Sequence, residues 1–233
     1  MKKASIIFEN VNLAFPEYDN RSFKKRLISV FREKPNRKPN LKGLFNLNFK
    51  ITKGERIGLY GPNGSGKTSL LRMISGIYTP SNGNVVINGK ILSLLNVSMG
   101  LDEDATGVEN IILKGLLLGL DKNKITALLP KIIKFAGLGN DLFLPLRLYS
   151  DGMKLRLAFS ISTILSSDIL LLDEWISVGD EKFQKKASVL LNSLIKKSSI
   201  LIFASHQKEL LNKICNRIFI IDSGRITKEV NKL

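Results

Sequence analysis

The chain carries one glycine-rich octapeptide whose residue types are suited to binding phosphate. It reads Gly-Pro-Asn-Gly-Ser-Gly-Lys-Thr at positions 61–68, directly after the apolar run at 56–60. Glycines let the backbone curl so that successive N–H groups point at phosphate oxygens; the lysine adds a positive charge, and the threonine hydroxyl can ligate Mg²⁺. A strand, this loop and a helix together predict a nucleoside triphosphate site. Its expected binding residues are Gly61, Pro62, Asn63, Gly64, Ser65, Gly66, Lys67, Thr68 and Ser69.

Two carboxylates follow a second apolar run and add to this chemistry. Asp173 and Glu174 come directly after residues 169–172, a wholly apolar stretch typical of a central parallel strand. Side chains at the carboxyl end of such a strand reach the ligand site. We expect Asp173 to join Thr68 in holding Mg²⁺, and Glu174 to orient or deprotonate the attacking water. An acidic pair that merely ends a strand is common, so the catalytic interpretation depends on the phosphate loop upstream.

Two more features have candidate roles at the same site. Tyr-Ser-Asp-Gly-Met at 149–153 begins a predicted helix, where the Ser150 hydroxyl and the Gly152 N–H favour an anion. The same residues would also serve as an ordinary N-cap. His206, the only histidine in the chain, follows a predicted strand at 200–203. A lone histidine is more often a bystander, but its position beyond the Asp–Glu pair makes His206 a catalytic candidate.

The elements that must position these residues follow from the spacing of apolar residues. Strands are expected at residues 5–15, 44–51, 85–87, 91–95, 169–172, 199–204 and 217–221. Helical patterns lie at residues 108–136, 152–165 and 183–195. Asn88-Gly89 predicts that the third and fourth strands form a hairpin. The order predicts an α/β fold in a single domain, residues 1–233, with a β-rich part (1–95), a mainly helical part (96–166) and an α/β completion (167–233).

These motifs resemble those of ABC-transporter ATPases. The stretch 149–153 is similar to that family's signature, usually Leu-Ser-Gly-Gly-Gln, and it lies between the phosphate loop and the Asp–Glu pair. Its Tyr-Ser-x-Gly-Met form, together with Asp-Glu-Trp-Ile-Ser-Val-Gly-Asp at 173–180, is similar to the ATPases that export O-antigen, capsular polysaccharide or teichoic acid. In that resemblance, Asp180 belongs to the loop that communicates across the ATPase dimer.

The resemblance implies a P-loop NTPase fold, the ABC cassette, with a RecA-like core, an antiparallel β-subdomain and a helical subdomain. It implies ATP and Mg²⁺ as cofactors, and a homodimer in which Ser150 and Gly152 of one copy cap the γ-phosphate held by the other. Glu174 and His206 are then catalytic. The implied partners are an integral membrane permease and a lipid-linked polysaccharide. O-antigen is the first candidate for that polysaccharide, and capsular polysaccharide or teichoic acid comes next. The implied location is peripheral, on the cytoplasmic face of the inner membrane.

Two features depart from the family's pattern or leave alternatives open. No glutamine lies between the phosphate loop and the signature, where the family has one that touches Mg²⁺; Asn96 is the candidate substitute. The family also stacks an aromatic residue on adenine. Phe15 fits best and Tyr18 is second, although either could be a core residue.

The composition narrows the class of partner. The chain has 36 basic and 20 acidic residues, a net charge of +16, with a basic segment at residues 21–42. This basic excess suggests a polyanionic partner, either nucleic acid or an anionic membrane surface, although a charge run is often a solvated loop. No window of 18 apolar residues suggests a transmembrane helix, and the lone Cys215 fits a buried side chain. The alternatives to polysaccharide export are a drug or ion exporter and a nucleic-acid-associated ABC ATPase. We expect no nucleic acid, because the 81 residues between Thr68 and Ser150 leave no room for the coiled coil of chromosome-type members, and translation-type members usually carry two cassettes where this chain has one.

Overall fold

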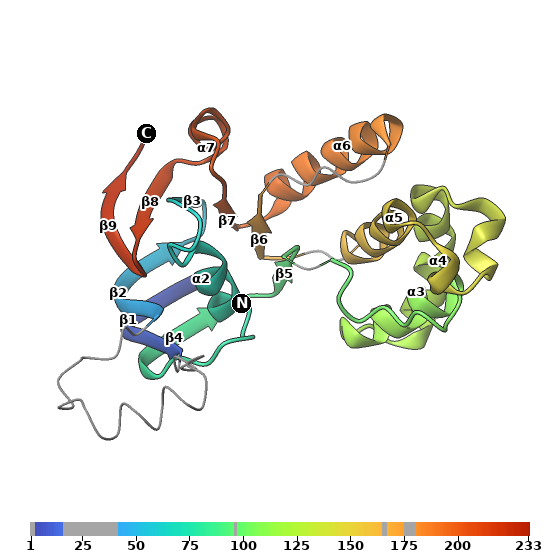
Figure 1. Cartoon of the computed structure of the whole chain (residues 1–233), viewed down its shortest axis with the longest axis horizontal. Coiled ribbons are helices and arrows are strands. Elements are labelled where there is room, and N and C mark those ends of the chain that lie inside the picture. Colours follow the sequence, from blue (N-terminus) through green and yellow to red (C-terminus); the bar gives the residue numbers. More distant parts are fainter. Residues whose placement is uncertain (1–2, 16–41, 96, 165–166, 175–179) are drawn as a thin grey trace, which may run out of the picture.

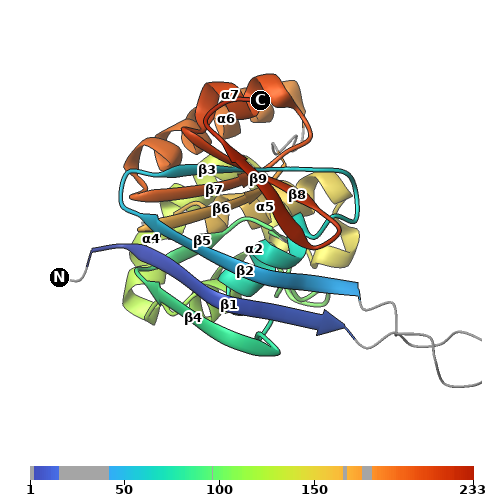
Figure 2. The same ribbon diagram turned by 90° about the vertical axis from the view of Figure 1, so that its left-hand side faces the viewer.

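The computed structural model describes residues 3–15, 42–95, 97–164, 167–174 and 180–233. In these ranges the chain forms a three-stranded sheet, a six-stranded sheet with helices on its two faces, and a separate group of helices (Figures 1 and 2). None of the helices in the described ranges has the length and apolarity that crossing a membrane requires.

The smaller sheet is antiparallel, in the order β2-β1-β4. Its strands are β1 (Ser5–Phe15), β2 (Lys42–Thr52) and β4 (Asn82–Asn88). In β1, Ile6 and Phe8 are buried by the usual alternation, but the next buried residue is Val11 instead of residue 10. The register shifts between Phe8 and Val11, where Asn10 has a φ of 52°. This bulge absorbs one residue and keeps the apolar side chains on the core face.

The larger sheet has the order β5-β6-β7-β3-β8-β9. Its strands are β3 (Arg56–Tyr60), β5 (Ile91–Ser93), β6 (Ile169–Asp173), β7 (Ile200–Ala204), β8 (Arg217–Asp222) and β9 (Arg225–Val230). All pairs are parallel except β8 with β9. The carboxyl ends of β3, β6 and β7 therefore lie at one edge of the sheet, where α/β proteins bind their ligands.

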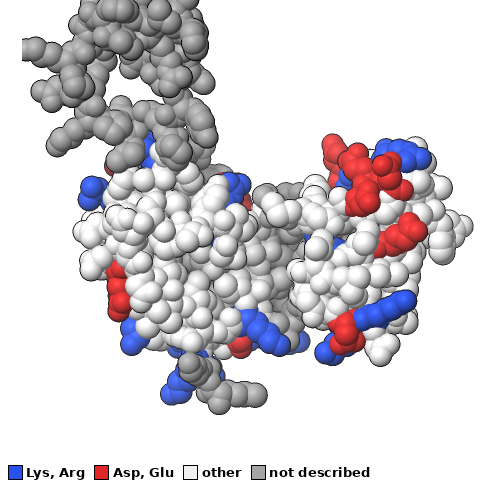
Figure 3. All heavy atoms as spheres, turned by 90° about the horizontal axis from the view of Figure 1, so that it is seen from below, with Lys and Arg blue, Asp and Glu red and all other residues white. Residues whose placement is uncertain are grey.

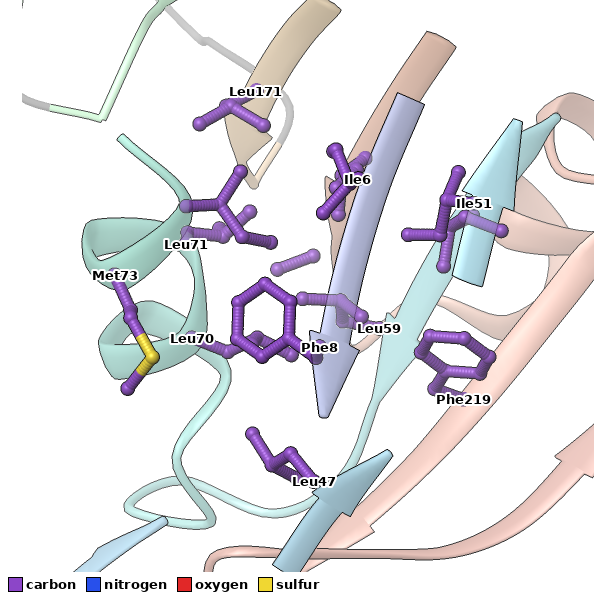
Figure 4. Packing of buried hydrophobic residues seen from close by; sticks show 14 of the residues in the cluster. Ile6, Phe8, Leu47, Ile51, Leu59, Leu70, Leu71, Met73, Leu171 and Phe219 are labelled. Atoms are coloured by element: carbon purple, nitrogen blue, oxygen red, sulfur yellow. The ribbon is translucent and has the colours of Figure 1, made fainter. Parts of the chain in front are cut away.

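Helices cover both faces of this sheet. Helix α2 (Lys67–Ile74) packs between the two sheets, where its Leu70 and Leu71 meet Phe8 and Leu59 (Figure 4). On the opposite face lie α6 (Glu181–Lys197) and α7 (Lys208–Ile214). Successive residues of β6 and β7 alternate between these two cores, which explains why both strands are apolar throughout.

The third part, called here the helical unit, lies between β5 and β6 in the sequence and stands apart from the sheets in Figure 1. Its elements are α3 (Gly107–Leu117), α4 (Lys122–Ala136), the 3₁₀ turns η1 (Gly139–Phe143) and η2 (Leu146–Leu148), and α5 (Asp151–Ser162). It has an apolar core of its own, which includes Ile111, Leu142 and Leu157. Polar side chains cap the three α-helices: Thr106, Asp121 and Ser150.

The predicted hairpin through Asn88-Gly89 is wrong. Strand β4 pairs with β1, and β5 pairs with β6, so the two strands belong to different sheets. Gly89 does turn the chain, with a φ of 120°. The turn then leads into the larger sheet because Lys90 binds Asp168 there: its N–H donates to Oδ2 over 2.8 Å. The other predicted strands and helical segments are present, and Cys215 is buried, as expected.

Candidate functional site

The phosphate loop leads from the carboxyl end of β3 into the start of α2. Gly64 and Gly66 have φ values of 78° and 111°, in the region that favours glycine. Gly61 has no room for a side chain, since a Cβ there would lie 2.1 Å from the carbonyl oxygen of Ile221. No acidic residue and no side-chain cap occupies the first turn of α2. The N–H groups of that turn are therefore available to an anion.

The lysine of the loop closes back on the loop itself. The Nζ of Lys67 donates to the carbonyl oxygens of Gly61 and Pro62 over 2.8 and 2.9 Å. Lys67 is only 9% exposed, so its charge is directed into the loop and not into solvent. Beside it, the hydroxyl of Ser65 is buried and has no hydrogen-bond partner among the described residues. Burying a hydroxyl without a partner is costly, so the Ser65 hydroxyl fits a loop that binds a polar ligand.

A pocket of about 470 Å³ opens in front of this loop. Its lining is made by Asn63, Gly64, Gly66, Lys67, Thr68, Ser69, Leu95, Asp173 and Glu174. The hydroxyl of Thr68 donates to Oδ2 of Asp173 over 2.7 Å, so the loop and the end of β6 meet there. The structure thus brings together residues separated by about a hundred positions, which the sequence predicts as joint Mg²⁺ ligands. Leu95 is a lining residue that the sequence did not single out.

Glu174 and His206 meet at the rim of the pocket. Nδ1 of His206 lies 2.9 Å from Oε1 of Glu174, and both side chains are more than half exposed, at 61% and 55%. Glu174 has a φ of 66°, unusual for a residue other than glycine, and its N–H donates to the carbonyl oxygen of Ala204 over 2.8 Å. That bond to the end of β7 holds the carboxylate beside the histidine. Backbone strain of this kind is concentrated at functional sites.

The signature residues lie elsewhere in the chain. Ser150 is the N-cap of α5 and its Oγ accepts from the N–H of Met153 over 3.3 Å; Gly152 is half-buried in the first turn. Neither residue lines the pocket, and α5 belongs to the helical unit, away from α2 (Figure 1). The hydroxyl proton of Ser150 is not used by the cap, because the oxygen is the acceptor. Ser150 can therefore cap its helix and still donate to an anion.

Tyr149, just before the cap, is fixed in the helical unit. Its hydroxyl donates to the carbonyl oxygen of Asp141 over 2.6 Å, and the side chain is 6% exposed. Burial raises the pKa of this hydroxyl, with a smaller contribution from the Asp141 carboxylate. A Cβ at Gly107 would lie 2.4 Å from the same hydroxyl, so glycine at 107 and tyrosine at 149 fit each other.

The remaining predicted residues have mixed outcomes. Phe15 is half-buried at the end of β1, outside the pocket lining, and its ring meets Tyr78 edge-on at 5.3 Å. Its role in stacking on adenine stays a prediction. Asn96 and Tyr18 lie outside the described residues, as does most of the basic segment at 21–42. Asp180 caps α6, accepting from the N–H of Phe183 over 2.8 Å.

A phosphate loop at the end of parallel strand β3, in contact with a carboxylate at the end of β6, defines a nucleotide-binding α/β protein. Comparison with known proteins narrows this class. Residues 44–177 match the ABC transporter family. The O-antigen export system ATP-binding protein RfbE of Yersinia enterocolitica is 37% identical in an alignment of 232 residues, and the match covers 97% of each chain. The teichoic acids export ATP-binding protein TagH of Bacillus anthracis is 37% identical over 94% of this chain, which spans 39% of TagH.

The chain belongs to the ABC transporter family and carries its ATP-binding domain. The predicted family is therefore confirmed. Among solved structures, a dimeric bacterial ABC transporter cassette superposes with a TM-score of 0.70 at 20% identity, over 97% of this chain and 98% of that one. A second cassette, in a post-hydrolysis dimer bound to ADP and Pi, has a TM-score of 0.69 at 19% identity, over 97% of this chain and 98% of that one. The predicted α/β cassette fold is confirmed by this likeness.

Proposed function

We propose that this chain is the ATP-hydrolysing subunit of an ABC exporter that moves a lipid-linked surface polysaccharide across the inner membrane. O-antigen is the first candidate, and capsular polysaccharide or teichoic acid follows. The observation that carries the proposal is the 37% identity with RfbE, because the match covers 97% of both chains. The teichoic acids export protein TagH, at the same identity, supports a polymer class broader than O-antigen.

In the proposed mechanism, the phosphate loop binds the β- and γ-phosphates of ATP. The N–H groups around Gly64 and Gly66 hold phosphate oxygens, and the Nζ of Lys67 moves from the loop carbonyls to the phosphates. Glu174 accepts a hydrogen bond from the attacking water and orients it, while His206 holds that carboxylate in place and donates to the γ-phosphate. Phe15 remains the candidate for stacking on the base.

The donor set at the pocket also fits Mg²⁺. Thr68 and Asp173 offer two oxygens 2.7 Å apart, and the described residues contain no cluster of three or more metal-binding side chains. Mg²⁺ is commonly held by one or two protein oxygens, with phosphates and water supplying the rest, so the small number of ligands suits it. When bound, Mg²⁺ would neutralise charge on the phosphates. Asn96 is kept as a further candidate ligand.

We infer that each site is completed by a second copy. In a head-to-tail dimer, Ser150 and the first turn of α5 would approach the γ-phosphate held by the partner's phosphate loop, with the Ser150 hydroxyl donating to it. The separation of α5 from the pocket within one chain supports this arrangement. The chain would then be one cassette, residues 1–233, whose helical unit, within 96–166, carries the signature. A separate membrane permease would convert closing and opening of the dimer into export, with this subunit peripheral on the cytoplasmic face.

The proposal is tested by replacing Glu174 with glutamine in the native cell and weighing lipid-linked glycans inside the cell and at its surface. We expect the polymer to accumulate inside and to be lost from the surface, because ATP binds but is not hydrolysed. Glu181→Gln is the control: it changes an exposed carboxylate at the start of α6, outside the pocket, and should leave export normal. Unchanged glycans with the Glu174 variant present would contradict the proposal and favour a drug or ion exporter.

A further inference from the structure

A second hollow, far from the phosphate loop in the sequence, lies between α4 and α6. It has a volume of about 710 Å³, and its lining is made by Lys131, Lys134, Phe135, Lys185, Lys186, Val189, Leu190 and Ser193. We call it the α4–α6 groove. The α6 residues recur at spacings of three and four, so they share one face of that helix. The groove therefore lies between the helical unit and α6, one of the helices that cover the larger sheet.

The floor of the groove is apolar and firmly held. The ring of Phe135 packs edge-on against Phe183 at 5.5 Å and lies 6.3 Å from Phe159, so it is anchored to the buried core. Val189, by contrast, is 73% exposed. A large apolar side chain this exposed, next to a half-buried Leu190, gives an amphiphilic ligand apolar surface to cover.

Lysines border this floor on both sides. Lys131 and Lys134 come from α4, and Lys185 and Lys186 come from α6. Lys185 is paired with Glu181, Nζ to Oε1 at 2.7 Å. The other three have no acidic partner within ion-pair distance in the part of the chain that the structure describes. The groove therefore presents uncompensated positive charge around an apolar trough.

We propose that the α4–α6 groove binds anionic phospholipid of the membrane surface, with the lysines on the phosphate and the trough against an acyl chain. The groove offers charge and apolar surface but few directional groups: its two helices pair their own backbone, and Ser193 is the single neutral polar side chain in the lining. Positive charge and apolar surface are enough to bind an anionic lipid, whereas a protein partner is usually recognised over a far larger area. The volume is within the range of sites that take one small ligand.

Acidic and basic side chains are unevenly distributed over the molecule, so the position of the groove lysines indicates which surface would face a negatively charged membrane. Exposed acidic side chains gather on the helical unit on the face seen in Figure 3. Asp102, Asp104 and Glu109, at the start of the helical unit and in α3, line a hollow separate from the groove. A membrane of negative charge would be repelled from that hollow and attracted to the α4–α6 groove. This inference deepens the proposed function, since it names a membrane contact, but it is measured without the permease and can fail while the export assignment stands.

The test is binding of the purified full chain to vesicles of phosphatidylcholine, with and without phosphatidylglycerol. The site variant carries Lys131→Gln, Lys134→Gln and Lys186→Gln. The matched control carries Lys3→Gln, Lys50→Gln and Lys53→Gln, three lysines that line a hollow beside the antiparallel sheet, so both variants lose the same net charge. We expect wild type to bind only the vesicles that contain phosphatidylglycerol. The site variant should bind them about 100-fold more weakly, and the control only slightly more weakly.

A second variant tests the trough. Val189→Ser should weaken binding about fivefold at both low and high salt, because it removes apolar contact, which salt does not screen. ATP hydrolysis without permease should be unchanged in all three variants, which verifies that they are folded. Equal losses in the two lysine variants would overturn the proposal, since net charge alone would then explain binding. The proposal would also be overturned if wild-type binding did not depend on phosphatidylglycerol. The same holds if the site variant still bound vesicles but no longer copurified with its permease.

Discussion

Replacing Lys114 by methionine should change how the stability of the protein depends on pH. Lys114 lies in α3 and is 5% exposed. Its Nζ donates to the carbonyl oxygens of Val97 and, over 3.3 Å, of Met99, in the segment between the nucleotide pocket and the helical unit. Asn110, one turn earlier, donates to the carbonyl oxygen of Asp102 over 2.8 Å. No carboxylate compensates the Lys114 charge among the described residues.

Burial lowers the pKa of the Lys114 ammonium to about 8, from an ordinary value of 10.5. The unfolded chain therefore holds more protons than the folded chain between these values, and stability must rise with pH across that window. Below about pH 8 the full cost of burying the charge is present; above about pH 10.5 none of it is. The difference of 2.5 corresponds to about 3 kcal/mol, of which about 2.5 kcal/mol is recovered between about pH 7 and about pH 10.

The assay is urea unfolding of wild type and Lys114→Met, followed by circular dichroism at about pH 7 and about pH 10. Groups common to both proteins cancel in the difference. Wild type should gain about 2.5 kcal/mol relative to the variant on going to the higher pH. Lys122→Met, at an exposed position in α4, is the control and should track wild type within about 0.5 kcal/mol. If the difference in unfolding free energy between wild type and Lys114→Met were the same at both pH values, the reasoning would be refuted.

Three further expectations follow from the site and its supports. Glu174→Gln should keep ATP binding and lower hydrolysis at least about 100-fold, which a phosphate-release assay checks; near-normal turnover would remove Glu174 from the mechanism. Gly107→Ala should cost about 2 kcal/mol in thermal unfolding, and adding Tyr149→Phe should recover part of it because the crowded hydroxyl is gone; strict additivity would argue against the clash. Asp180→Ala should cost about 1 kcal/mol through the lost cap on Phe183, and no loss would mean that water replaces it.

Much of the fold could be predicted because apolar spacing reports burial directly. Residues 169–172 are apolar throughout, and β6 is indeed enclosed by cores on both faces. The Asn88-Gly89 turn misled because a turn residue sets a local bend but not the partner of the next strand. That partner is chosen by long-range packing, here β1 for β4 and β6 for β5. Strand β9 and the short helix α7 were not predicted, because the spacing of apolar residues within each is too brief to indicate an element.

The parts of the site that could be predicted are those whose residue types and spacing indicate a single chemistry. Lys67 and Thr68 belong to a loop whose glycine spacing is specific, and the contact of Thr68 with Asp173 follows from the order of the motifs. Leu95 and Lys114 could not be found this way. A leucine at the end of a strand gives no chemical signal, and a lysine in an apolar helix is most simply placed on its surface. Only the folded chain reveals that Lys114 turns inward onto two carbonyl oxygens.

The central claim, that each ATP site is shared by two copies, is tested most directly by mixing two inactive variants. Lys67→Ala disables the phosphate loop; Ser150→Asp keeps an N-cap residue on α5 but sets a carboxylate against the γ-phosphate. Each alone should lose ATP hydrolysis. In a head-to-tail dimer, a mixed pair has one site with both changes and one intact site, so an equal mixture should regain about one quarter of wild-type activity. An inactive mixture, with mixed dimers demonstrated by differential tags, would contradict the shared site.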